Sequence, residues 1–235
     1  MLGIIGAMEV EVKNIKNQME QVNVEEVAGM KFASGLWHGR RVTVVRSGVG
    51  KVNAAVCTQI LVDRFDVDAV INTGIAGSLR NEINIGDVVL SADALQHDMD
   101  ARNFGYDLGV IPQMKVSDFA ADQGLLEAAA AACEETCPDI RVHKGRVVSG
   151  DQFISDKDKK RQLVEAFDPY CTEMEGAAIA QTAYLNQIPF LIIRAISDKA
   201  DDSASMDYGD FEAMAVANSV KILSAMVEKM PAGEQ

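Results

Sequence analysis

Charged and hydroxyl side chains stand beside two apolar runs in the second half of the chain. The candidates for chemistry are Glu173, Glu175, Arg194, Ser197 and Asp198. A carboxylate at the edge of an apolar element is costly to bury unless it has a partner or a task. One interpretation is a site for a polyhydroxylated, partly apolar ligand, in which Asp198 acts as an acid. The alternative is structural, with carboxylates favoured by a helix dipole and an aspartate in a turn.

The elements around these residues predict how they are positioned. Residues 176–186 have the pattern of an apolar helix, and residues 190–196 have that of a buried strand. Two further carboxylates, Glu9 and Glu11, fall in the first turn of a helix that follows a strand at 2–7. Ligands of open α/β sheets bind at the carboxyl ends of strands, which is where this turn lies. A dipole-favoured first turn remains the structural alternative.

The rest of the chain alternates between strand and helix patterns. Strands are expected at 30–37, 41–46, 69–72, 86–94 and 141–149, and helices at 52–65, 118–136, 156–167 and about 210–230. The first two strands form a hairpin, residues 73–77 form a turn, and 96–114 form a long irregular segment. This alternation predicts an α/β fold with a mainly parallel sheet that the hairpin makes mixed. Because no repeat or linker interrupts it, we expect a single domain over 1–235.

Composition restricts the partners. The 235 residues carry a net charge of -13, which disfavours binding to nucleic acid or to an anionic membrane surface. There is no run of 18 apolar residues, and the apolar start of the chain lacks the basic lead-in of a signal peptide. Four cysteines are few for this length and indicate free thiols in a reducing compartment. We therefore expect a cytoplasmic protein.

Two motifs that suggest cofactors do not hold up. The glycines around Lys51 suggest a phosphate loop, but no glycine stands five residues before Gly50, and Val52 replaces the Ser or Thr that binds magnesium. Cys133 and Cys137 have the spacing of half a metal site, yet no matching pair of Cys or His completes it, and thiols in a helix core are the simpler interpretation. We expect neither a metal nor a cofactor.

Six short segments occur in an order that resembles one family. They are residues 3–9, 47–52, 72–77, 148–154, 173–175 and 194–198. Together they resemble the bacterial 5'-methylthioadenosine/S-adenosylhomocysteine nucleosidases of the nucleoside phosphorylase-like superfamily, over almost the whole chain. The resemblance implies a three-layer αβα sandwich with a mixed central β-sheet.

The resemblance also implies a reaction. It is hydrolysis of the N-glycosidic bond of 5'-methylthioadenosine and S-adenosylhomocysteine, and also of 5'-deoxyadenosine, to adenine and the 5-thioribose product, in methionine salvage and methyl-cycle recycling. By analogy with glycoside hydrolysis, the base is protonated, a water attacks from the opposite face, and negative charge stabilises the cationic sugar. The implied catalytic residues are Asp198 as general acid, Glu11 activating water, and Glu175 binding the ribose hydroxyls.

Further positions are assigned to the substrate by the same resemblance. They are Met8, Val49, Gly77, Phe104, Phe153, Ile154, Glu173, Met174, Arg194, Ser197 and Phe211. Phe153 is expected to stack on adenine, and the Ile154 backbone to read its edge. Phe104 is expected to reach the neighbouring subunit's pocket, which implies a homodimer. Ile75 stands where some relatives carry a serine near the base, so any hydrogen bond of that serine is absent or replaced here.

Three rival functions follow from the same residues. A purine nucleoside phosphorylase needs basic groups around a phosphate; Arg46 and Arg194 could serve, but Glu9 and Glu11 would repel the anion, by about 4 kcal/mol for two unit charges at roughly 4 Å. A futalosine-type nucleosidase would share the purine pocket. A non-catalytic nucleoside sensor would not need both Glu11 and Asp198.

Overall fold

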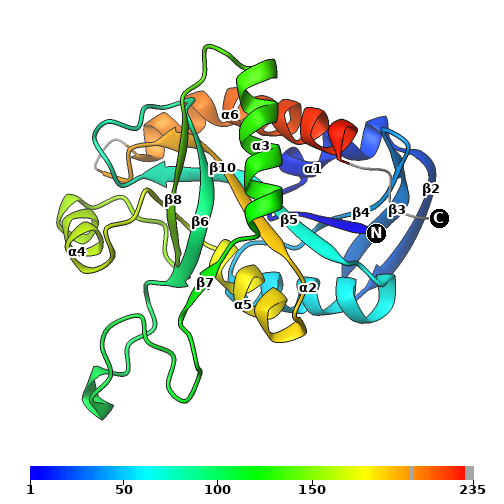
Figure 1. Ribbon diagram of the computed structural model, residues 1–235. Helices are drawn as coiled ribbons and strands as arrows, with labels where there is room; N and C mark the ends of the chain where they lie inside the picture. Colours follow the sequence, from blue (N-terminus) through cyan, green and yellow to red (C-terminus); the bar gives the residue numbers. More distant parts are fainter. Residues whose placement is uncertain (202–203, 231–235) are drawn as a thin grey trace.

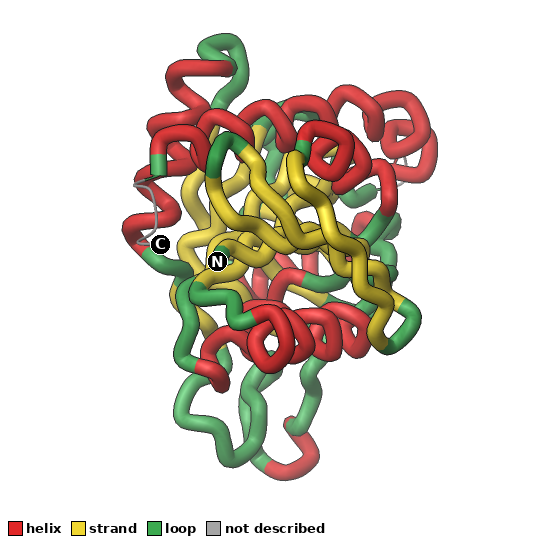
Figure 2. Tube along the Cα trace, turned by 90° about the vertical axis from the view of Figure 1, so that its right-hand side faces the viewer, coloured by secondary structure: helices red, strands yellow, loops and turns green. Residues whose placement is uncertain are grey.

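The computed structural model describes residues 1–201 and 204–230, in which a central β-sheet lies between two layers of helices. One face is covered by α1 (Glu9–Gln18), α3 (Gln123–Thr136) and α6 (Ala204–Lys229), and the other by α2 (Lys51–Phe65) and α5 (Gly176–Asn186) (Figure 1). Figure 2 shows the strands running between these layers. The expected three-layer αβα architecture is confirmed. The remaining helix, α4 (Lys157–Phe167), packs at one end of the sheet.

The sheet is mixed. Its strands within the described residues are β1 (Leu2–Gly6), β2 (Glu20–Val27), β3 (Met30–Trp37), β4 (Arg40–Arg46), β5 (Ala69–Ser78), β6 (Val88–Gln96), β7 (Asp118–Ala120), β8 (Val142–Ser149), β9 (Cys171–Glu173) and β10 (Phe190–Asp198). Strands β4, β1, β5 and β10 pair in parallel, in that order. Their carboxyl ends therefore meet at one edge of the sheet, where ligands of such folds bind.

A β-bulge interrupts the pairing at the end of β10. Ile196 is paired with Ala76 and Asp198 with Gly77, so Ser197 is an extra residue on β10. A bulge of this kind bends a strand and re-aims the side chains beyond it, and bulges are common next to active sites. The end of β10 is therefore irregular where Asp198 stands.

The core is divided by the sheet into two apolar clusters. Along β10, Leu191 and Ile193 pack towards α3 and α6, whereas Ile192 and Ile196 pack towards α2 and α5. Side chains of successive strand residues point to opposite faces, and both faces of this strand are covered. This is why β10 is buried throughout and reads as a continuous apolar run.

Three expectations about local structure are wrong, and one strand was missed. Strand β2 was not predicted, because its largely exposed, charged residues at the sheet edge lack an apolar face. Residues 73–77 are not a turn but continue β5, buried between neighbouring strands. The helix expected at 118–136 is preceded by the short β7, and α3 starts after Asp122, whose carboxylate accepts the N–H of Leu125 at 2.9 Å. Helix α6 starts at Ala204, earlier than expected.

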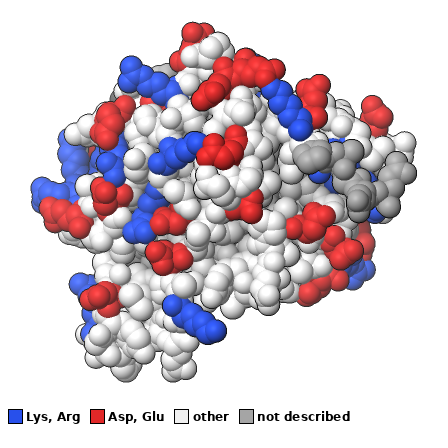
Figure 3. All heavy atoms as spheres, in the orientation of Figure 1, with Lys and Arg blue, Asp and Glu red and all other residues white. Residues whose placement is uncertain are grey.

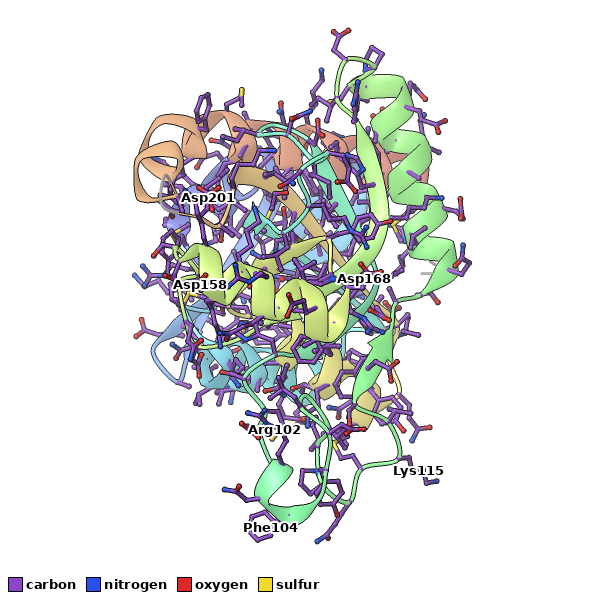
Figure 4. The ribbon with its side chains drawn as sticks, turned by 90° about the vertical axis from the view of Figure 1, so that its left-hand side faces the viewer. Arg102, Phe104, Lys115, Asp158, Asp168 and Asp201 are labelled. Carbon is purple, nitrogen blue, oxygen red and sulfur yellow. The ribbon has the colours of Figure 1, made fainter. Side chains whose placement is uncertain are left out.

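The segment between β6 and β7 projects from the body of the protein. It contains a short 3-10 helix, Arg102–Phe104, and Figure 4 shows Phe104 at its tip, away from the sheet. On the face seen in Figure 3, acidic groups are interspersed with basic ones rather than separated from them. Across residues 1–201 and 204–230, no helix combines the length and apolar character needed to cross a bilayer.

Candidate active site

A cavity of about 380 Å³ lies at the carboxyl ends of β1, β5 and β10. Its lining comprises Ala7, Met8, Glu11, Val49, Ile75, Ala76, Gly77, Phe153, Thr172, Glu173, Met174, Glu175, Arg194, Ser197, Asp198 and Tyr208. Both sequence stretches that suggested chemistry therefore reach the same cavity. Its size lies within the range usual for small-molecule sites.

Glu11 is held at the start of α1. Its carboxylate accepts the N–H of Met8 at 2.9 Å and the N–H of Ile75 at 3.3 Å. Burial raises the pKa of Glu11, and the nearby Arg194 and these backbone donors offset that rise only in part. Gly74 leaves the space for this carboxylate, because a Cβ there would lie 2.6 Å from Glu11 Oε1. Glu11 is therefore a fixed, buried group with a raised affinity for a proton.

Arg194 and Glu173 form a buried ion pair. Glu173 Oε2 also accepts the N–H of Gly176 at 2.7 Å and that of Glu175 at 3.1 Å, which are the first donors of α5. Ser149 Oγ donates to Glu173 Oε1 and accepts the N–H of Ala177 at 2.7 Å. The start of α5 is thus capped by side chains from outside the helix.

The guanidinium of Arg194 is enclosed on several sides. It donates to Asn72 Oδ1 and, at 3.2 Å, to the carbonyl of Ile75. Burial acts to lower the pKa of Arg194, but the negative charges of Glu173, Glu175 and Glu11 outweigh it and raise that pKa. Its Nε has no hydrogen-bond partner among the described residues. Arg194 is therefore a permanent cation whose Nε–H remains available as a donor.

Glu175 stands between the turn before α2 and the guanidinium. Its Oε1 accepts the N–H of Gly50 at 2.8 Å, and its Oε2 lies 3.7 Å from Arg194 Nη2. Burial, followed by the charge of Glu173, raises the pKa of Glu175 to about 7. The carboxylate is therefore poised to gain a hydrogen-bond donor, which would favour its charged form.

Asp198 lies just beyond the bulge of β10. Its carboxylate accepts the N–H of Ala200 at 2.8 Å and the hydroxyl of Ser197 at 2.9 Å. Gly77 leaves the room, since a Cβ there would stand 2.7 Å from Asp198 Oδ1. The missing side chain of Gly77 therefore makes room for the carboxyl group of Asp198 and for Ala200, whose Cβ would lie 2.9 Å from a Cβ at residue 77.

The outer wall of the cavity is aromatic and sulfur-rich. Phe153 is half exposed and meets the ring of Tyr208 edge-on, with centroids 6.1 Å apart. The hydroxyl of Tyr208 donates to Glu212 at 2.9 Å and lies 3.3 Å from the sulfur of Met8. Such a wall suits the face of a planar ring and an apolar substituent.

The buried charges of the cavity are unbalanced. Glu11, Glu173, Glu175 and Asp198 supply acidic groups, and Arg194 is the one basic residue among the described residues of the lining. A cavity of this sign stabilises positive charge that develops in a ligand and repels a second anion. The arrangement can therefore donate a proton at one end, hold a water at the other, and stabilise a cation between them.

Most of the predicted site residues lie in the lining, and three do not. Phe104, Ile154 and Phe211 are outside it among the described residues. Phe104 is 85% exposed at the tip of its loop, and Ile154 is buried in the apolar cluster beneath α4. Glu9, which the sequence suggested would repel a phosphate, lies on the surface, where its Oε2 is 3.3 Å from Lys16 Nζ. Arg46 is also exposed. Of the two glutamates and two arginines in that comparison, Glu11 and Arg194 line the cavity and Glu9 and Arg46 do not.

The residues that the sequence did not reveal as cavity-lining are small or ambiguous. They are Ala7, Ala76, Thr172 and Tyr208. The two alanines carry no chemical signal. Thr172 precedes Glu173 in a three-residue strand too short to recognise, and Tyr208 comes from the start of a helix predicted to begin later. Tyr208 could have been found as an aromatic residue near an acidic loop.

Comparisons with known proteins agree with this geometry. The family model of the phosphorylase superfamily matches residues 1–228. A 5'-methylthioadenosine/S-adenosylhomocysteine nucleosidase of Staphylococcus aureus is 41% identical over 231 residues, which cover 98% of this chain and 100% of the relative.

Two solved structures superpose on nearly the whole chain. The nucleosidase of the same name from Neisseria meningitidis, in complex with methylthio-immucillin-A, has a TM-score of 0.94 and 39% identity, covering 97% of this chain and 99% of that one. Futalosine hydrolase of Helicobacter pylori has a TM-score of 0.92 and 31% identity, covering 97% of each chain. The chain therefore belongs to the phosphorylase superfamily and, within it, to the family of 5'-methylthioadenosine/S-adenosylhomocysteine nucleosidases.

Proposed function

We propose that this enzyme hydrolyses the N-glycosidic bond of 5'-methylthioadenosine and S-adenosylhomocysteine, and also that of 5'-deoxyadenosine, releasing adenine. The observation that carries the proposal is the joint presence of Glu11 and Asp198 in one acidic cavity. Release of adenine and a thioribose would serve methionine salvage and recycling of the methyl cycle. The buried, free thiols of all four cysteines support a reducing compartment, and we place the enzyme in the cytoplasm.

Asp198 is proposed to protonate the leaving base at N7. Proton donation by a positioned carboxyl group typically accelerates such a step by about 10²–10⁴-fold. Gly77, which lines the cavity beside this carboxyl group, is proposed to offer close backbone approach, and Phe153 is proposed to stack on the base. The backbone of Ile154, next in the chain, is proposed to read the edge of the base.

Glu11 is proposed to orient the water and take its proton. Its raised pKa supports a role as a base, because burial makes the carboxylate a better proton acceptor than an exposed one. Arg194 and Glu173 are proposed to hold the surroundings of that water, and the Nε of Arg194, which has no partner among the described residues, is proposed as a further donor to it. Water is then added to the anomeric carbon as the bond to the base breaks.

Glu175 is proposed to accept hydrogen bonds from the ribose hydroxyls. Donation from two hydroxyls would be charge-assisted and would lower the pKa of a carboxyl group that stands near 7 in the free enzyme. Binding of ribose therefore favours the charge that stabilises the cationic sugar. Met8, Val49, Met174 and Phe211 would surround the 5' substituent.

A homodimer with shared sites is also part of the proposal. Phe104 projects from the body with 85% of its surface exposed, so its ring is available to pack against another subunit. Val49 and Phe153, at the cavity, are each about half exposed. We expect the Phe104 loop of one subunit to complete the pocket of the other. Mixing Phe104→Ala with inactive Asp198→Asn should then restore activity, whereas full activity of Phe104→Ala alone would contradict the shared site.

Futalosine hydrolysis is the second candidate, supported by the close superposition on the Helicobacter pylori futalosine hydrolase. The deciding experiment measures base release from 5'-methylthioadenosine, S-adenosylhomocysteine, 5'-deoxyadenosine and futalosine in phosphate-free buffer, and again with added phosphate. We expect phosphate-independent adenine release with the largest kcat/KM for the thio-substrates. A larger value for futalosine would favour the second candidate, and strict dependence on phosphate would assign a phosphorylase.

A further inference from the structure

Thr172 carries a buried hydroxyl for which residues 1–201 and 204–230 provide no hydrogen-bond partner. The residue is only 5% exposed, and it lines the active-site cavity. A hydroxyl can donate one hydrogen bond and accept two, and burying it unpaired is unfavourable. Thr73 also has an unpaired buried hydroxyl but does not line the cavity. Thr172 is therefore the one of these two that a ligand can reach.

The sheet places Thr172 level with Asp198. Thr172 of β9 is paired with Gly77 of β5, and Gly77 is in turn paired with Asp198 of β10. Neighbouring strands lie about 4.8 Å apart, so the backbones of Thr172 and Asp198 stand roughly 10 Å apart across Gly77. Thr172 and Asp198 both line the cavity, so a base held between them can present one edge to each.

We propose that the Thr172 hydroxyl donates a hydrogen bond to N3 of the departing purine. This inference rests on the proposed function, in which Asp198 protonates N7, because N3 and N7 lie on opposite edges of the base. N3 carries no hydrogen, so the hydroxyl must be the donor. As the glycosidic bond breaks, its electron pair moves into the purine, and N3 becomes a better acceptor. The hydrogen bond strengthens in the transition state and thereby contributes to catalysis.

The test compares Thr172→Val, which removes the hydroxyl but keeps the shape, with the matched control Thr73→Val. The substrates are 5'-methylthioadenosine and its 3-deaza analogue, in which C–H replaces N3. We expect Thr172→Val to lower kcat/KM for 5'-methylthioadenosine by about 3- to 10-fold, the usual range for one neutral hydrogen bond. The 3-deaza analogue should show no such loss, Thr172→Ser should retain the effect of the hydroxyl, and Thr73→Val should change neither substrate's value.

Two further measurements separate this contact from a structural role and from the reaction itself. Since the hydroxyl is unpaired in the free protein, Thr172→Val should not lower the melting temperature. Calorimetric titration with adenine and 3-deazaadenine reads the contact without turnover, and the wild type should prefer adenine by a margin that Thr172→Val loses. An equal loss on both substrates, no loss on either, or equal binding of the two bases by the wild type would overturn the proposal. Failure of the wild type to release adenine would instead refute the proposed function, and the titrations would still decide the contact.

Discussion

Replacing Gly74 by alanine tests whether Glu11 and Arg194 must keep their positions. A Cβ at residue 74 would lie 2.4 Å from Arg194 Nη1 and 2.6 Å from Glu11 Oε1. Each atom would have to withdraw by roughly 1 Å to reach an ordinary contact of 3.4 Å. Both side chains are buried and held by several hydrogen bonds, so neither can simply rotate into solvent.

The expected magnitude follows from this displacement. A misplacement of about 1 Å in a catalytic group can lower the rate by about 10²-fold. Added bulk in a tightly packed interior typically destabilises a protein by about 1–3 kcal/mol. We therefore expect Gly74→Ala to fold, to melt at a lower temperature, and to lose kcat for adenine release by roughly two orders of magnitude.

The assay is spectrophotometric adenine release at saturating 5'-methylthioadenosine, together with thermal unfolding. Gly209→Ala is the matched control, because a Cβ there meets nothing within 4 Å and its position in α6 tolerates alanine. We expect the control to keep its activity and its stability. If Gly74→Ala retained wild-type kcat, the positions of Glu11 and Arg194 would not limit the reaction, and the role given to them would be refuted.

Three further predictions concern the acidic groups. Asp198→Asn should lower kcat by at least about 10²-fold while binding of a substrate analogue persists; near-normal turnover would remove Asp198 as the proton donor. The pKa of Glu175 is raised from 4.5 to about 7, so between these pH values the folded protein holds a proton that the unfolded chain has lost. This group therefore makes the free energy of unfolding of the ligand-free enzyme fall as pH rises from about 4.5 to about 7. Glu175→Gln should flatten that dependence in melting curves, and an unchanged slope would contradict the assignment. Ser149→Ala should cost about 1–3 kcal/mol in urea denaturation and raise KM, since it removes the hydroxyl that donates to Glu173 Oε1 and accepts the Ala177 N–H. The partly exposed Ser224→Ala should cost much less.

The sequence pattern revealed the elements that end at the site but not the contacts between them. The apolar run of β10 and the charged residues that follow it were sufficient to predict a buried strand with a polar end. The pattern could not reveal that Glu11 and Arg194 lie close together, because their proximity depends on the order in which β1, β5 and β10 pair. Individual polar residues such as Ser149 and Thr172 were also invisible as site residues, since their meaning comes only from what surrounds them. Strand β2 was missed for a related reason: an exposed edge strand has no buried face to impose a periodic pattern.

At the end of β10, regular backbone pairing with β5 is interrupted next to a side chain proposed to react. Deleting Ser197 would let β10 continue its ladder with β5 without interruption, and the backbone pairing would become more regular. The same deletion would leave Asp198 paired with Gly77, but it would remove the hydroxyl that donates to the carboxylate at 2.9 Å. The protein thus keeps one residue more than a regular strand requires, and that surplus residue supplies the acid with a hydrogen-bond donor of its own.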